Sequence, residues 1–89
     1  MSPEEALKSV RDAALHGALE YTTHARQQME LRNARREDVK AALRSTSVAR
    51  PDPPPEAKWR FEGGKDVDGE DLMVVAECCG WRWRIVTVF

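Results

Sequence analysis

The fold is decided by the stretch YTTHARQQMELRNARREDVKAAL, which spans Tyr21–Leu43. Thr23 is a favourable N-cap, because its hydroxyl can accept a hydrogen bond from a free backbone N–H group in the first helical turn. We therefore expect a helix to begin at His24. Asn33 tolerates the left-handed conformation that often follows a helix, so it predicts that this helix ends after about ten residues.

Apolar residues in this stretch indicate which sides of its helices are buried. Ala25 and Met29 lie one turn apart, which predicts that they pack inward, and Arg32 continues their row. A second helix follows, with Glu37 and Asp38 in its first turn, where negative charge is favourable. The apolar stripe of this second helix consists of Val39, Ala42 and Leu43.

A further helix is predicted at the N-terminus. Ser2 is its N-cap, Pro3 suits the first helical position, and Glu5 completes a capping box. Apolar residues then recur at helical spacing as far as Gly17, where we expect the helix to end.

The period changes to that of strands after position 57. Strands are predicted at 58–62, at Leu72–Cys78 and at Trp81–Phe89, and the short turn at Cys79-Gly80 favours antiparallel pairing. Trp81, Trp83, Ile85, Thr87 and Phe89 share one face of the last strand, which we expect to pack on the helices. The predicted fold is α+β, with N-terminal helices packed on one face of a three-stranded antiparallel sheet.

The segment RPDPPPE at residues 50–56 separates helices from strands. Its prolines fix the backbone and remove hydrogen-bond donors, so we interpret it as a stiff connector. A proline-rich ligand for another domain is the alternative.

Length and composition indicate one domain that spans residues 1–89. A hydrophobic content of 42% supports folding, and no apolar run approaches the length of a membrane span. The N-terminus lacks the zones of a signal peptide, so we expect a cytoplasmic protein. Cys78 and Cys79 are adjacent and point to opposite faces of a strand, so we expect free thiols rather than a disulfide or a structural zinc site.

The net charge of −1 conceals an uneven distribution. Residues 24–44 carry six basic and three acidic side chains, whereas residues 52–77 carry three basic and eight acidic ones. A protein that is nearly neutral overall can therefore present one basic face to a polyanion. The alternative is ordinary solvated helix charge.

Several of these elements together resemble a small, largely uncharacterised bacterial domain family. The chain has the family's His-Ala-x-x-x-Met-x-x-Arg helix, its Glu-Asp-Val helix and its Thr-Val-aromatic ending, which here is Thr87-Val88-Phe89. The resemblance covers about residues 18–89, and the family is grouped with RelE- and BrnT-like toxins of toxin–antitoxin systems. One departure is that Arg35-Arg36 replace the family's small polar residue before the second of these helices.

The resemblance implies a toxin-like protein of ribonuclease-type fold that binds RNA and is a candidate for cleaving it without a metal or another cofactor. His24 would be the acid–base group and Arg32 would stabilise charge developing on the phosphate. The candidate substrate-binding residues are Arg26, Arg60, Arg82 and Arg84. The implied partners are RNA and a cognate antitoxin, with no direct contact to DNA or a membrane.

The alternative function is a non-catalytic protein-interaction module. Trp81, Trp83 and Phe89 would then be interface anchors rather than core residues. Independently of that choice, the structural alternative for His24 is that its ring anchors the helix to the sheet, and the alternative for Arg82 and Arg84 is a solvated edge of the sheet. Tryptophan exposure discriminates between these functions.

Overall fold

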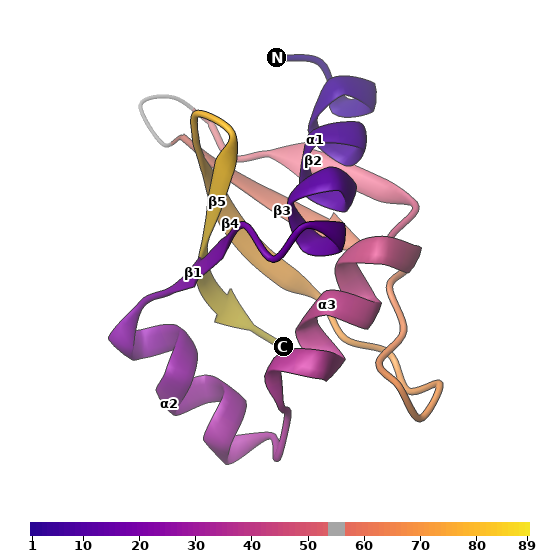
Figure 1. Ribbon diagram of the computed structural model, residues 1–89, viewed down its shortest axis with the longest axis vertical. Coiled ribbons are helices and arrows are strands. Elements are labelled where there is room, and N and C mark those ends of the chain that lie inside the picture. The colour runs from indigo at the N-terminus through magenta and orange to yellow at the C-terminus, as the bar shows by residue number, and fades with distance from the viewer. Residues whose placement is uncertain (54–56) are drawn as a thin grey trace.

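A computed structural model of the chain describes residues 1–53 and 57–89 (Figure 1). The described part of the chain contains three helices, α1 (Pro3–Leu15), α2 (Thr23–Leu31) and α3 (Arg36–Ser45). It also contains five strands, β1 (Leu19–Tyr21), β2 (Val48–Pro51), β3 (Lys58–Glu62), β4 (Val74–Cys79) and β5 (Arg82–Val88). Within these residues, no helix is long and apolar enough to cross a membrane.

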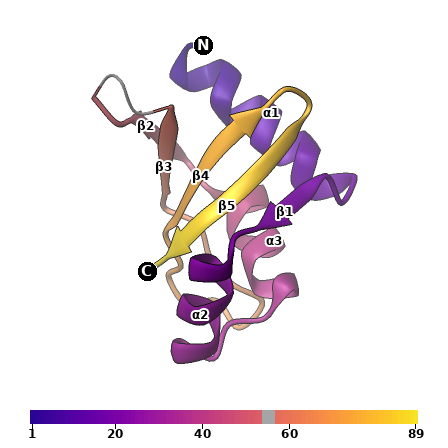
Figure 2. The same ribbon diagram turned by 90° about the vertical axis from the view of Figure 1, so that its left-hand side faces the viewer.

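The strands form one mixed sheet in the order β1-β5-β4-β3-β2 (Figure 2). β1 runs parallel to β5, whereas the other neighbouring strands are antiparallel. The prediction of a three-stranded antiparallel sheet was therefore wrong. The three predicted strands form the centre of the sheet, and β1 and β2 each add an edge strand within an α+β fold.

The two edge strands escaped prediction for physical reasons. β1 has only three residues, too few to display a two-residue period, and its partner Trp83 is far away in the sequence. β2 ends at Pro51, and proline is tolerated at the edge of a sheet, where its missing N–H group leaves no ladder bond unmade. The predicted connector at 50–56 thus begins inside β2, and its residues 54–56 lie outside the described residues.

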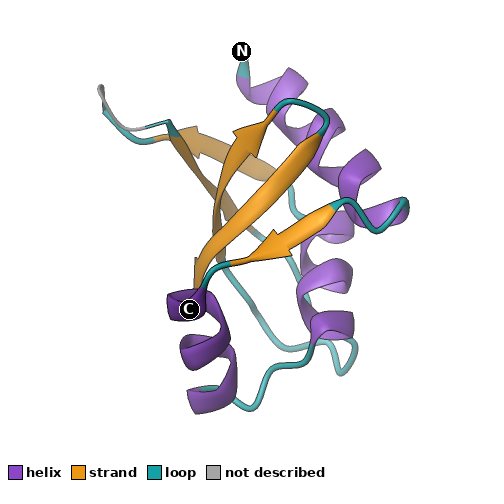
Figure 3. Ribbon diagram, turned by 60° about the vertical axis from the view of Figure 1, so that its left-hand side comes forward, coloured by secondary structure: helices purple, strands orange, loops and turns teal. Residues whose placement is uncertain are grey.

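Helices α1 and α3 pack against each other and cover one face of the sheet, whereas α2 lies at one end, beside β5 (Figure 3). α2 begins one residue earlier than predicted, and its N-cap is Thr22, whose Oγ1 accepts a hydrogen bond from the Ala25 N–H at 3.0 Å. The same hydroxyl donates to the Val86 carbonyl at 3.2 Å, so it ties the start of the helix to β5. Asn33 has a φ of 56°, as expected for the residue that ends α2.

The core lies between the helices and the sheet. Its largest side chains are Trp83 and Phe61, whose ring centroids lie 5.3 Å apart at an interplanar angle of 75°. Trp83 is fully buried, and its indole Nε1–H donates to Ser9 Oγ of α1 at 2.9 Å, which satisfies the polar atom of the ring. Met29, Val39, Leu43, Trp83 and Ile85 are buried as predicted. The core also contains Val10, Trp59, Phe61, Leu72 and Val74.

The prediction of which side chains of β5 pack on the helices is correct only in the middle of the strand. The register with β4 passes from Ile85 to Thr87 and skips Val86, which is a β-bulge that shifts the alternation of side chains. Val88 is therefore buried in place of Thr87, and Phe89 is 48% exposed. Trp81 precedes the strand, lies in the β4–β5 turn and is 76% exposed.

Candidate functional site

The two predicted catalytic residues are exposed at opposite ends of α2. His24 lies in the first turn, and Arg32 is the C-cap residue. Their separation of eight residues corresponds to about 12 Å along a helix axis. Among the described residues, neither side chain takes part in a hydrogen bond or an ion pair. The structure does not bring His24 and Arg32 together around one reacting phosphate.

The predicted substrate-binding arginines lie on separate elements. Arg26 is exposed on α2, and Arg60 is exposed on β3, where it faces Val75 of β4. Arg82 and Arg84 lie on β5, which is separated from β3 by β4. These residues are not gathered into one compact site.

The arginines of β5 form ion pairs with acidic side chains. Arg82 Nη1 lies 2.5 Å from Glu20 Oε1 of β1, and Arg84 Nη1 lies 2.9 Å from Glu77 Oε1 of β4. Arg84 also approaches Glu20, at 3.8 Å. The hydrogen bond to Glu77 raises the pKa of the Arg84 guanidinium above its usual value. Both arginines are therefore already engaged with carboxylates before any ligand arrives.

The pairing follows from the sheet register. Glu20 of β1 lies opposite Arg84, Arg84 lies opposite Glu77, and Glu77 lies opposite Lys58 of β3. Residues opposite each other on neighbouring strands point to the same face, so charges of alternating sign form a row across four strands. This face of the sheet is mixed in charge rather than basic.

A more uniform basic surface lies on α3. Arg36, Lys40 and Arg44 are exposed and recur at intervals of four residues, so they line one side of the helix. We call these three residues the basic ridge. Within the described residues, none of the three takes part in an ion pair, so their charges are available to an anion. The ridge was not predicted, although its four-residue spacing is visible in the sequence.

Tyr21 lies at the N-terminal end of the ridge. The Arg36 guanidinium lies 4.9 Å from the centroid of the Tyr21 ring, which is a cation–π contact. The Tyr21 hydroxyl is buried without a hydrogen-bond partner among the described residues. Burial raises the pKa of the Tyr21 hydroxyl and outweighs the opposing effect of Arg36. Tyr21 is thus a neutral support for Arg36 rather than an acid–base group.

Asp38 explains how α3 begins without a small polar residue at its N-cap. Its side chain is buried, and its carboxylate accepts hydrogen bonds from the N–H groups of Arg35 at 2.8 Å and Val67 at 3.3 Å. The bond from Arg35 is the main reason that the pKa of the Asp38 carboxyl lies below its usual value. Carboxylate oxygens of Asp38, Asp66 and Asp68 lie within 4.8 Å of one another. The Asp38 and Asp66 carboxylates accept backbone hydrogen bonds, which indicates a structural role in holding the 66–70 loop against α3.

Among the described residues, the surface has at least two hollows that are large enough to hold a ligand. One, of about 410 Å³, is lined by Gln27, Gln28, Glu30 and Leu31 of α2. The other, of about 450 Å³, lies beside α1 and the β4–β5 turn. Neither hollow is lined by His24 or Arg32, so the predicted catalytic pair lies outside both.

Comparison with known proteins gives one match. A family model described as "Domain of unknown function (DUF4258)" matches residues 21–89, which begin at the last residue of β1 and leave out α1. No curated protein and no solved structure is significantly similar to the chain. The match itself carries no link to RelE- or BrnT-like toxins, so that relationship stays a hypothesis.

Proposed function

The chain belongs to the DUF4258 domain family, and on this premise we propose that it is a toxin-like RNA-binding domain that holds the phosphate backbone with the basic ridge of α3. The residues assigned to the phosphates are Arg36, Lys40 and Arg44. Arg26 and Arg32, both exposed on the neighbouring helix α2, are secondary candidates for contact with the same strand of RNA.

The observation that carries the proposal is the difference between two sets of cations. Arg82 and Arg84 lie within 4 Å of Glu20 or Glu77, so a phosphate that approached them would also meet the field of these carboxylates. The cations of the ridge have no such partner among the described residues. When the ridge binds the phosphates of a nucleic acid, the nucleic acid releases its condensed counterions, and no carboxylate has to be displaced. This release of counterions is the main source of nonspecific affinity for nucleic acids.

Support for RNA over DNA comes from the resemblance to RelE- and BrnT-like toxins. The position of α3 suits contact with a nucleic-acid backbone. The side of the helix opposite the ridge is buried through Val39 and Leu43, and Asp38 fixes the first turn. A helix seated in this way presents one row of side chains to a ligand. A DNA strand of the same sequence is therefore the competitor in the test.

RNA cleavage is a second step that this proposal does not require. General acid–base catalysis needs the imidazole within hydrogen-bond reach of the reacting hydroxyl and a cation at the phosphate. His24 is exposed at the start of α2, where free backbone N–H groups favour a phosphate, and this position keeps cleavage open as a hypothesis. A cognate antitoxin and a cytoplasmic location belong to the same hypothesis.

The proposal is tested by titrating a short fluorescent single-stranded RNA with the protein and following anisotropy. We expect saturable binding that weakens as salt is added, and weaker binding of the matched DNA strand. An RNA affinity that does not change with salt would remove the ridge from the proposal. A preference for DNA would leave a phosphate-binding domain but remove the assignment to RNA.

A further inference from the structure

The three cations of the basic ridge have different surroundings. The guanidinium carbon of Arg36 lies 4.9 Å from the centroid of the Tyr21 ring, so the ring covers one side of this planar group. Among the described residues, neither Lys40 nor Arg44 has an aromatic ring within cation–π distance. Arg36 is therefore the member of the ridge that offers a ligand more than its charge.

The sheet and the core hold the Tyr21 ring in place. Tyr21 is the last residue of β1 and lies opposite Ile85 of β5, whose side chain is fully buried. Residues opposite each other on neighbouring strands point to the same face, so the Tyr21 ring lies on the helix side of the sheet. The hydroxyl at the far end of the ring is buried as well. A guanidinium that rests on a fixed ring loses less conformational freedom when a ligand binds to it.

The other side of the Arg36 guanidinium is open. Arg36 is exposed, and within the described residues its guanidinium has no ion-pair or hydrogen-bond partner, so the side turned away from Tyr21 faces solvent. A guanidinium is planar and stacks on flat π systems. In RNA the flat groups are the bases, and unpaired bases stack on arginine guanidinium planes as they do on aromatic side chains.

The spacing along α3 allows one nucleotide to contact two residues of the ridge. Arg36 and Lys40 are one helical turn apart, which is about 6 Å along the helix axis. The Lys40 ammonium is a compact point charge that suits a phosphate, whereas the supported guanidinium of Arg36 offers a plane. A nucleotide whose phosphate meets Lys40 can therefore turn its base toward Arg36.

We propose that Arg36, supported by Tyr21, is a stacking platform for an unpaired base of single-stranded RNA. This inference rests on the proposed function, because it assigns the base-binding part of the same site. Lys40 and Arg44 hold phosphates, and Arg36 adds the contact with a base. Every base has a π face, so such a platform selects single strands rather than a particular sequence.

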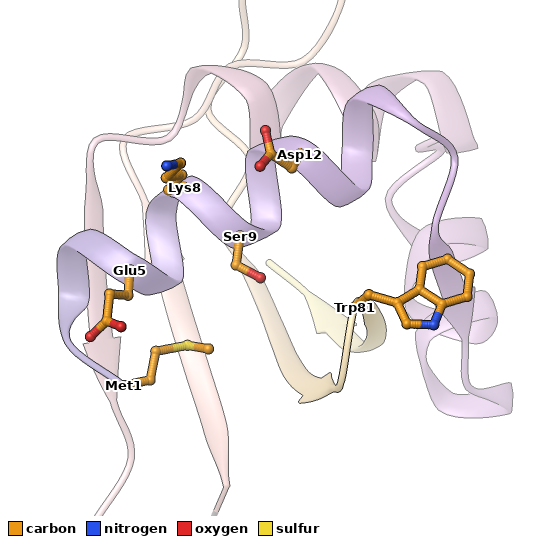
Figure 4. A pocket seen from close by; sticks show the side chains of 6 residues that line it. All are labelled: Met1, Glu5, Lys8, Ser9, Asp12 and Trp81. Carbon is orange, nitrogen blue, oxygen red and sulfur yellow. The ribbon is translucent and has the colours of Figure 1, made fainter.

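A second contact between an arginine and an aromatic ring provides a control. Arg82 lies 5.6 Å from the centroid of the Trp81 ring, and Trp81 is 76% exposed, so this ring could also stack on a base. Figure 4 shows Trp81 beside α1, where it lines the hollow of about 450 Å³. No residue of the basic ridge lines that hollow, so Trp81 is separate from the proposed platform.

The test compares, by anisotropy, two labelled strands of equal length: an oligouridylate and a ribose-phosphate strand that carries no bases. The wild-type protein should bind the oligouridylate about fivefold more tightly, because only this strand can stack. Arg36→Lys keeps the charge but removes the plane, so it should lose this difference and keep the dependence of affinity on salt. Arg44→Lys is the matched control, since it makes the same change on the same helix without a ring behind it, and it should keep the difference.

Changes at Tyr21 separate the ring from its hydroxyl. Tyr21→Phe keeps the ring and should keep the fivefold difference between the strands. Tyr21→Leu removes the ring and should lose the difference, with folding checked by circular dichroism. Trp81→Ala should keep it, because Trp81 lies away from the ridge.

The possible failures are distinguishable. Equal binding of the two strands by the wild-type protein would overturn the platform and leave phosphate binding by the ridge intact. No binding of either strand would overturn the proposed function and the platform with it. The platform would also be overturned by a base preference that survives Arg36→Lys, or by one that is lost in Arg44→Lys or in Trp81→Ala.

Discussion

Arg84 donates a hydrogen bond to Glu77 across the β4–β5 pair, with 2.9 Å between Arg84 Nη1 and Glu77 Oε1. The two residues are register partners, so the sheet itself sets their approach. A cation held in this way is less available to a phosphate than one without a carboxylate beside it.

The first prediction concerns the arginines of β5. Replacing Arg82 and Arg84 together with glutamine should change the slope of log affinity for RNA against log salt by less than half of the roughly 1.4 units expected for two lost phosphate contacts. Folding stability should fall only slightly, because exposed ion pairs contribute about 0–1 kcal/mol each. A slope that flattens by the full amount would show that these arginines leave their carboxylates to hold phosphates.

The second prediction concerns Gly64, which lies against α3. A Cβ atom at this position would lie 2.3 Å from the carbonyl oxygen of Ala42, a backbone atom that cannot rotate away. Gly64→Ala should therefore destabilise the fold by about 1–3 kcal/mol, as overpacking does in other cores. Urea unfolding measures this loss, and a change below about 0.5 kcal/mol would mean that the 63–72 loop moves away from α3 at little cost.

The third prediction concerns pH and Asp38. Because the folded-state pKa of Asp38 is lowered, its stabilising contribution is fully present above the unfolded-state pKa of about 3.9 and is lost as pH falls through the folded-state value. The free energy of unfolding should therefore fall on acidification below about pH 4, and less steeply in Asp38→Asn. Thermal unfolding at a series of pH values measures both slopes. Parallel curves for the two proteins would remove Asp38 as the source.

The fourth prediction concerns cleavage. If the protein cuts RNA, His24→Ala should lower the rate by about 100-fold or more, which is the usual scale of a lost acid–base group. His16→Ala is the matched control, because His16 is also exposed but lies at the C-terminal end of α1. Cleavage that is equally fast in folded His24→Ala would exclude His24 from the mechanism. A wild-type protein that binds RNA without cutting it would leave the proposed binding function intact.

Helix boundaries were predictable because their causes are local. The capping box of Ser2 and Glu5 and the left-handed Asn33 depend on neighbours within a few residues, and both occur as expected. The edge strands β1 and β2 depend instead on distant partners, for example Leu19 beside Trp83, and no local pattern specifies such pairing.

The candidate site also has features with local causes, which the sequence can predict, and features that depend on distant partners, which it cannot. The exposure of Arg82 could be expected from its place next to Trp83, but its pairing with Glu20 depends on the parallel contact of β1 with β5, which the sequence does not display. The bulge at Val86 likewise reversed the expected orientation of Phe89. The basic ridge could have been predicted from the sequence, because recognising a spacing of four residues within one helix needs no tertiary information.

The fifth prediction tests the central claim that the basic ridge holds RNA phosphates. We predict that changing Arg36, Lys40 and Arg44 together to alanine weakens binding of single-stranded RNA. It should also flatten the slope of log affinity against log salt by about two units, since each single-strand phosphate contact contributes about 0.7.

The most direct measurement compares that salt slope with the slope of a second triple variant in which Arg50, Lys65 and Arg82 are changed to alanine. This control removes the same net charge but takes only cations that are paired, with Glu62, Asp71 and Glu20 respectively. We predict a slope about two units flatter for the ridge variant and a slope near the wild-type value for the control. Equal slopes in the two variants, or no RNA binding by the wild-type protein, would contradict the account.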